Sequence, residues 1–328
     1  MDRIKLIKEA DYVRDMTEIV LPYLKKRKES GDFERVAGQP IHYRFYAADA
    51  SRAELVLVHG FTEGIDKFNE VVYYFLQAGF DVWQIQQRGH GKSYRAHPDP
   101  SLVHIEDYRN LVRDLHHFVT EVVGKKQRST GHADLPKYLY GHSMGGGVSA
   151  LYLEHFPNDF QKAVLSSPML ELSAGGTPVW MAKMYGRVMS GIGRGGNYLA
   201  GNAPFRAVED FENSCSNCLT RYRYWFQITC ERPEYQTCAT SIRTALEFLK
   251  IVKEATLPKN CARVKADVLL MQAGQDNMVL PGGQEAFIRN IGSHGRLVRM
   301  ENAKHEIYLG VDEDLEVYWK EILDFLEP

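Results

Sequence analysis

The stretch Gly141-His142-Ser143-Met144-Gly145 has the pattern G-x-S-x-G and stands between an apolar run, 138–140, and a helical pattern over 144–156. A serine at a sharp strand-to-helix turn adopts a strained backbone conformation that leaves room only for glycine two residues to either side. The turn lifts the hydroxyl above the sheet edge, and the next helix directs its first amides towards it. The pattern alone is common, but its place between a strand and a helix predicts that Ser143 is a nucleophile.

Short apolar runs alternate with helical patterns on both sides of this turn. The runs cover 55–58, 80–85, 138–140, 163–165 and 268–271, and helices are expected at 66–78, 104–123, 144–156, 281–290 and 312–326. Such alternation predicts an α/β fold with a mostly parallel, doubly wound sheet. A leading antiparallel hairpin is expected at 34–47, after a helical preface of about thirty residues.

The alternation stops between Met169 and Asn260, where no run typical of a buried strand occurs. This part contains a Gly-rich stretch at 191–196, an aromatic cluster at 222–226 and a helical pattern at 239–254. An insertion of this size between two strands of one sheet predicts a helical cap. We therefore expect residues 1–168 and 261–328 to form the core and residues 169–260 to form the cap.

A serine hydroxyl needs a base to become nucleophilic, and the base needs a carboxylate to orient it. In folds with this elbow the chain order is serine, acid, histidine. Asp276 follows the strand pattern VLLMQAG, and His305 follows RLVRM after a short loop. Both therefore belong at the sheet edge that carries Ser143. We predict Asp276 as the acid and His305 as the base.

Two other residues compete for these roles. His294 follows the acid as well, but it precedes the last strand and so belongs at the opposite edge of the sheet. Glu171 follows the preceding strand, at an alternative position for the acid, in a less turn-like context. Asp276 and His305 are preferred because they complete a spatially consistent set.

An oxyanion hole requires two backbone donors. One is expected from Met144, the residue after the nucleophile. The other is expected from Phe61, because His59-Gly60-Phe61 follows the strand pattern ELVLV in an inward-turning loop. The tight loop Arg88–Ser93 follows the next strand, and we interpret it as structural support for the site.

Two further patterns are set aside. Gly191, Gly193 and Gly196 satisfy G-x-G-x-x-G, but they follow no buried strand and open no clear helix, so no dinucleotide site is expected. Cys215 and Cys218 have CxxC spacing without a second tight pair, so we expect free thiols and neither metal nor cofactor.

Together, GHSMGG, HGFTEG, QRGHGKS, MQAGQDNMVLP and AKHEIYLG resemble the bacterial lysophospholipase and monoacylglycerol lipase branch of the α/β-hydrolases, over about residues 34–327. The resemblance implies the same catalytic set, with Phe61 and Met144 as oxyanion donors and a cap over an acyl pocket. Glu63 and Glu306 match family positions without an assigned role. Gln86 stands where the family usually has aspartate, which puts the bracing of the following loop in doubt.

We therefore expect a serine carboxylic-ester hydrolase that cleaves lysophospholipids or monoacylglycerols through an acyl-enzyme on Ser143. Cleavage of short esters or peptides is the alternative, and a hydrolase-fold binding protein without catalysis is a third reading. In 178–189, Val179, Trp180, Met184, Val188 and Met189 can share a helical face, with Lys183 and Arg187 elsewhere. Such a face suits peripheral contact with a membrane, although an apolar stripe more often packs on its own core.

The composition is that of a globular chain, with 44% hydrophobic and 25% charged residues among 328. A net charge of −2 supplies no long-range attraction for nucleic acid, so no such partner is expected. There is no run of eighteen apolar residues and no apolar stretch near the start that would be typical of a secretory signal. With five cysteines, an odd number, these features favour a cytoplasmic protein.

Overall fold

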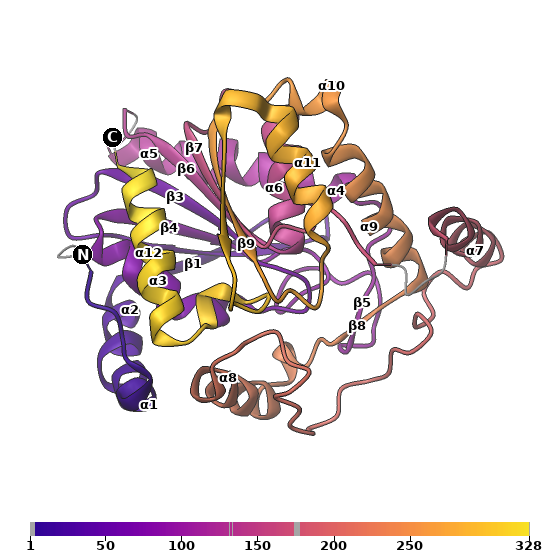
Figure 1. Ribbon diagram of the computed structural model, residues 1–328, viewed down its shortest axis with the longest axis horizontal. Coiled ribbons are helices and arrows are strands. Elements are labelled where there is room, and N and C mark those ends of the chain that lie inside the picture. The colour runs from indigo at the N-terminus through magenta and orange to yellow at the C-terminus, as the bar shows by residue number, and fades with distance from the viewer. Residues whose placement is uncertain (1–3, 131, 133, 174–177, 328) are drawn as a thin grey trace.

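An eight-stranded sheet runs through the centre of the protein in the order β1-β2-β4-β3-β6-β7-β9-β10 (Figure 1). The computed structural model describes residues 4–130, 132, 134–173 and 178–327. The strands of this sheet are β1 (Lys28–Phe33), β2 (Ile41–Tyr46), β3 (Ala53–Val58), β4 (Phe80–Ile85), β6 (Lys137–His142), β7 (Lys162–Ser166), β9 (Asp267–Ala273) and β10 (Gly295–Met300). Only the pairings of β2 with β1 and β4 are antiparallel. The predicted mostly parallel, doubly wound α/β sheet is confirmed.

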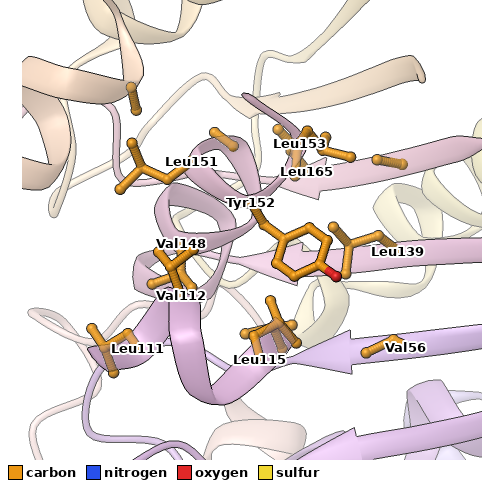
Figure 2. Packing of buried hydrophobic residues seen from close by; sticks show 14 of the residues in the cluster. Val56, Leu111, Val112, Leu115, Leu139, Val148, Leu151, Tyr152, Leu153 and Leu165 are labelled. Carbon is orange, nitrogen blue, oxygen red and sulfur yellow. The ribbon is translucent and has the colours of Figure 1, made fainter. Parts of the chain in front are cut away.

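Helices cover both faces of the sheet, and alternate residues of each strand face one layer or the other. Val56 and Val58 of β3 belong to one apolar cluster, whereas Leu55 and Leu57 belong to the other. The first layer contains α4 (Arg109–His117), α6 (Met144–His155) and α11 (Pro281–Ile291), and the second contains α3 (Asn69–Gln77) and α12 (Asp312–Leu326). Figure 2 shows the first layer, in which α4 and α6 pack on Val56 and its neighbours in the sheet.

Two predicted boundaries differ from the structure. The hairpin expected at 34–47 consists of β1 and β2, so its first strand begins at Lys28. β1 is a mostly exposed edge strand, and its polar sequence therefore lacks the apolar alternation by which buried strands are recognised. The helix expected at 104–123 begins at Arg109 and continues through a π-helical turn (Phe118–Val123) into α5 (Gly124–Thr130).

The helical preface ends at Arg27, where β1 begins. It consists of η1 (Glu9–Asp11), α1 (Tyr12–Asp15), the π-turn η2 (Met16–Val20) and α2 (Leu21–Arg27). Tyr12, Met16, Val20 and Leu24 are buried against the α3 and α12 layer. The preface therefore adds to the core on that face of the sheet.

The chain leaves the sheet between β7 and β9, where the cap is predicted. This part contains α7 (Val179–Gly191), α8 (Leu219–Glu231), η5 (Pro233–Tyr235), β8 (Ala239–Thr240), α9 (Ile242–Ala255) and α10 (Pro258–Cys261). β8 pairs with β5 (Leu102–Val103) in a separate two-stranded sheet. Phe248 and Ile251 of α9 join the apolar cluster around α6, whereas α7 lies at the periphery, against α9 (Figure 1). The division at 169–260 thus remains our interpretation, and its last helices pack as part of the core layer.

Candidate active site

The G-x-S-x-G turn has the strained geometry that its sequence predicts. Ser143 lies between the end of β6 and the start of α6 with φ 52° and ψ −119°, in a region that non-glycine residues rarely adopt. A Cβ on Gly145 would come within 2.2 Å of the Val58 carbonyl oxygen, and one on Gly141 within 2.5 Å of Ser149 Oγ. Because no side chain fits at either position, the two glycines allow the sharp bend that presents Ser143.

Three side chains that are far apart in the sequence form a chain of hydrogen bonds at this bend. His305 Nε2 lies 2.8 Å from Ser143 Oγ, and His305 Nδ1 lies 2.8 Å from Asp276 Oδ2. Asp276 follows β9, and His305 follows β10. The carboxyl ends of these parallel strands share one edge of the sheet, which brings both residues to the serine. The arrangement has the geometry needed for proton transfer from the hydroxyl.

The Asp276 carboxylate is held in its ionised form. Burial alone would raise its pKa, but the bond to His305 and the amides of Val279 and Met278 outweigh this effect and lower it. Asp276 Oδ1 accepts both amides, at 2.9 and 2.8 Å. An ionised Asp276 orients the imidazole so that Nδ1 donates and Nε2 is free to accept a proton.

The two competing residues lie elsewhere. His294 Nδ1 is 3.0 Å from Asp267 Oδ1, at the beginning of β9 and so at the opposite edge of the sheet. Glu171 accepts the Leu280 amide through its carbonyl oxygen, and its side chain lies next to Gly282 at the start of α11. The carboxylate that contacts His305 is that of Asp276.

The two predicted oxyanion donors are an amide at the start of a helix and an amide in a loop that is fixed by hydrogen bonds. Met144 is the first residue of α6, so its amide is among those that have no acceptor within the helix. Phe61 lies between Gly60, whose amide donates to Glu63 Oε2 at 2.5 Å, and Thr62, whose amide donates to His90 Nε2 at 3.1 Å. These bonds fix the peptide on either side of Phe61.

Two buried histidines lock the Phe61 loop to the loop at Arg88–Ser93. His59 Nδ1 donates to the Gly60 carbonyl at 2.7 Å, and His59 Nε2 accepts the Gln87 amide at 2.9 Å. Burial lowers the pKa of His59 and lowers that of His90 well below its usual range. Both rings are therefore neutral, as they must be to accept an amide. The contacts agree with our interpretation of Arg88–Ser93 as structural support.

Gln86 resolves the doubt raised by the missing aspartate. Its side-chain oxygen accepts a hydrogen bond from the Lys92 amide at 2.9 Å, and its backbone carbonyl oxygen accepts one from the Ser93 hydroxyl. Gln86, just before the loop, is thus tied to the last two residues of the loop. Glycine at position 91 makes room for this side chain, because a Cβ there would come within 1.8 Å of Gln86 Nε2. Gly91 also has a positive φ of 49°, which favours glycine. The uncharged glutamine thus braces this loop through the same kind of bond that a carboxylate would make.

A buried charged cluster behind the site gives positions to two residues that sequence reasoning left without a role. Glu63 accepts the Gly60 amide on one oxygen and the Tyr308 hydroxyl, at 2.5 Å, on the other. Lys67 in η3 (Ile65–Phe68) pairs with Glu306 and lies 3.4 Å from Glu63 Oε1. Burial alone would lower the Lys67 pKa, but the two carboxylates outweigh it and raise it. In the sequence, the only sign of a role for Glu63 is its place directly after HGFT. The only sign for Glu306 is its place directly after His305.

Neither the cysteines nor the glycine fingerprint belongs to the hydrogen-bonded set of Ser143, His305 and Asp276, although the Cys215 carbonyl oxygen accepts the Glu306 amide at 2.8 Å. All five cysteines are free thiols. Burial raises the pKa of Cys215 and of Cys218, which disfavours their reactive thiolate forms. Gly191 is the last residue of α7, and the turn that contains Gly193 and Gly196 follows a helix. The fingerprint therefore lacks the preceding strand that a dinucleotide site requires.

Comparisons with known proteins identify the family of the chain. Residues 49–312 match the family model described as serine aminopeptidase, S33. The chain is 27% identical over 263 residues to a probable lysophospholipase L2 from Haemophilus influenzae, covering 80% of each chain. It is 26% identical over 320 residues to lysophospholipase L2 from Escherichia coli, covering 92% of this chain and 88% of the relative.

A solved structure shows the same fold. Monoglyceride lipase from Saccharomyces cerevisiae matches with a TM-score of 0.72 at 19% identity, covering 92% of this chain and 95% of that one. The family match, which spans most of the chain, and the lysophospholipase relatives indicate the same class of enzyme. The chain belongs to the serine aminopeptidase S33 family and is a serine hydrolase with the α/β-hydrolase fold.

Proposed function

We propose that the protein hydrolyses the carboxylic esters of monoacyl lipids, lysophospholipids or monoacylglycerols, with Ser143 as nucleophile, His305 as base and Asp276 as acid. The observation that carries the mechanism is the pair of 2.8 Å hydrogen bonds through the His305 ring at the strained bend. The names of the lysophospholipase and monoglyceride lipase relatives support the substrate class.

In the acylation step, Ser143 Oγ attacks the ester carbonyl carbon while His305 Nε2 takes the hydroxyl proton. The carbonyl oxygen becomes an oxyanion and accepts the amides of Phe61 and Met144, each worth about 3–4 kcal/mol of transition-state stabilisation. When the carbon–oxygen ester bond breaks, His305 returns the proton to the leaving alkoxide. The lysolipid head group departs as an alcohol, and the acyl chain stays on Ser143.

Deacylation repeats the sequence with water. His305 Nε2 removes a proton from the water molecule, and the resulting hydroxide attacks the acyl carbonyl in the same oxyanion environment. The proton then passes to Ser143 Oγ as the acyl-oxygen bond breaks. The product is a fatty acid, and the free hydroxyl is restored.

Fluorophosphonate labelling combined with a substrate series tests this proposal. Wild type should label at Ser143, and Ser143→Ala should not, because the phosphonate forms its bond to the serine oxygen. Monoacylglycerols and lysophosphatidylcholines with acyl chains of two to eighteen carbons, and aminoacyl amides, should then be compared by kcat/KM. Labelling that persists in Ser143→Ala contradicts the nucleophile, and a maximum at acetyl or butyryl esters, or with amides, contradicts the lipid assignment.

The outer face of α7 supports a further part of the proposal, peripheral contact between the cap and a membrane. Trp180, Met184 and Val188 are 66, 54 and 56% exposed and recur at helical spacing, with Met181 and Tyr185 exposed beside them. The side chain of Met189, predicted on the same face, is half-buried. The inner face, at Gly186, packs on Leu246 of α9. The apolar stripe thus faces away from the core.

The flank of the same helix carries positive charge. Lys183 and Arg187 line a groove of about 440 Å³ with Lys253 of α9 and Lys259 of α10. Lys250 lines it as well, against the single acid Glu254, so the groove has an excess of positive charge. An exposed apolar face flanked by cations suits the boundary between acyl chains and anionic head groups. No helix in the described ranges is long and apolar enough to cross a bilayer.

Co-sedimentation with vesicles of phosphatidylcholine and phosphatidylglycerol tests the membrane contact. Wild type should sediment with anionic vesicles, and the double variant Trp180→Ser/Val188→Ser should not. Val317→Ser removes a 48% exposed apolar residue from α12, on the far side of the molecule from α7, and should bind as wild type does (Figure 1). Wild-type sedimentation at background level contradicts the contact and leaves the esterase proposal untouched.

A further inference from the structure

Two buried carboxylates lie side by side at the beginning of the central sheet, away from the active site. Glu54 of β3 and Asp81 of β4 are register partners in the parallel pair, and each is 2% exposed. The catalytic residues follow the opposite, carboxyl ends of the strands. Nothing in the proposed mechanism uses this pair, and bringing two acids together in a buried place is unfavourable unless something compensates their charge.

Among the described residues, the pair accepts bonds from two neutral donors and has the Lys126 ammonium in the same cavity. One oxygen of each carboxylate accepts a neutral donor, Trp83 Nε1 for Glu54 and the Ala48 amide for Asp81. The Lys126 ammonium lines the same cavity, but it also pairs with Glu29 and lies 4.0 Å above the Phe45 ring centroid. Burial, with a contribution from Asp81, raises the pKa of Glu54 to about 7. Two buried acids in register on neighbouring strands thus form a place where a further positive charge is favourable.

An imidazole completes the cluster. His132 Nδ1 lies 3.5 Å from Asp81 Oδ2, and His132 donates its own backbone amide to the Gln127 carbonyl oxygen at 2.9 Å. One ligand atom from each of Glu54, Asp81 and His132 lies within 4.8 Å of the other two. Ligand atoms that lie 2.0–2.2 Å from a tetrahedral ion are about 3.4 Å from each other. The three side chains would therefore move by roughly 1 Å to bind the ion together. The cluster opens on a cavity of about 490 Å³.

We propose that Glu54, Asp81 and His132 bind one divalent cation of the zinc class at this edge of the sheet. One nitrogen and two carboxylate oxygens form a ligand set that Zn²⁺ accepts, with water in the remaining position. Mg²⁺ and Ca²⁺ prefer oxygen ligands alone and are disfavoured by the imidazole. The cation joins the connection between α5 and β6 to the first residues of β3 and β4. Its role is to stabilise the fold, and no step at Ser143 depends on it.

Calorimetric titration of chelator-treated protein with ZnCl₂ tests this site. Wild type should bind one zinc ion, and the midpoint of thermal unfolding should rise. His132→Ala should weaken binding by at least about tenfold, because even the loss of a residue that only supports a ligand costs about 10- to 100-fold. Because the His132 side chain is 40% exposed, this variant should fold normally, whereas Glu54→Gln changes the core. MgCl₂ and CaCl₂ should give no comparable heat at the same concentrations.

Two controls separate this site from other sources of zinc binding. His294→Ala removes a 41% exposed histidine that contacts one carboxylate, Asp267, and should bind as wild type does. His305→Ala should also retain binding, which distinguishes this cluster from the catalytic pair. No zinc binding by wild type, or equal binding by His132→Ala, overturns the proposal.

Discussion

The hydroxyl of Tyr308 donates to Glu63 Oε1 at 2.5 Å, across a separation of 245 residues. Glu63 also accepts the Gly60 amide, and Tyr308 stands three residues after His305. This carboxylate therefore connects the loop that carries one proposed oxyanion donor to the loop that carries the proposed base. Through these two bonds, Glu63 fixes the position of the proposed donor relative to the proposed base. Fixed positions of this kind let an enzyme stabilise a transition state.

Glu63→Gln should lower kcat about 10- to 100-fold with little change in KM. Glutamine has a single side-chain oxygen, so it cannot accept the Gly60 and Tyr308 bonds on two separate oxygens as Glu63 does. It also removes one of the two charges that hold Lys67. The expected loss is smaller than the 10²–10³ that removal of an oxyanion donor causes, because the donor is displaced and not deleted. Steady-state hydrolysis of a chromogenic ester measures both constants.

Tyr308→Phe is the matched control, since it deletes only one of the bonds to Glu63. Its kcat should fall by less than that of Glu63→Gln. A Glu63→Gln enzyme with wild-type kcat and an unchanged unfolding midpoint would show that the connection has no catalytic consequence.

Asp276→Asn should reduce kcat by about 10⁴ while leaving the fold intact. The amide no longer selects the imidazole tautomer in which Nε2 can accept the Ser143 proton. Glu171→Gln, at the competing acid position, should stay close to wild type because Glu171 lies next to Gly282. The reverse outcome, with Glu171→Gln inactive and Asp276→Asn active, would transfer the role of acid to Glu171.

Gly145→Ala should destabilise the protein by about 3 kcal/mol or more, beyond the usual range for overpacking. Its Cβ would meet backbone carbonyl oxygens of Val58 and His59 at 2.2 and 2.4 Å, and backbone cannot move aside as a side chain can. Gly191→Ala is the control: a Cβ there meets nothing within 4 Å. Urea unfolding should show a large loss for the first variant and none for the second, and equal effects would contradict the geometry of the turn.

Glu154 should make the stability of the wild type fall as pH rises. Burial raises its pKa to about 8, and its Oε2 has no hydrogen-bond partner among the residues that the structure describes. The folded protein holds this proton between pH 4.5 and 8, whereas the unfolded chain releases it, so stability is complete below pH 4.5 and is lost as pH rises through 8.

Glu154→Gln keeps the neutral form at every pH. It should therefore be more stable than wild type at pH 9, by about 2–4 kcal/mol, and close to wild type at pH 5. Urea titrations at pH 5, 7 and 9 measure the difference, with the exposed Glu285→Gln as a control that should show no such trend. A constant difference across this range would mean that Glu154 is ionised in the folded protein.

Local sequence alone determined the turn at Ser143 and the strands around it. Gly141 and Gly145 can be recognised because a steric requirement of the backbone leaves few residue types at those positions. Buried parallel strands and their helices have periods that are visible in the sequence, and the order of the strands places Asp276 and His305 at one edge. The edge strand β1 was misplaced because it is mostly exposed and therefore lacks the apolar residues that reveal a strand.

Only the tertiary structure decided the contacts between distant segments. The Glu63–Lys67–Glu306 cluster joins residues 63 and 306, and the Glu54–Asp81–His132 cluster depends on the register of β3 and β4. Which face of α7 packs on α9 was likewise undecided, because an apolar stripe has the same period whether it faces the core or solvent. The sequence determines which side chains are present, but the electrostatic environment of each one depends on neighbours that are brought close only by folding.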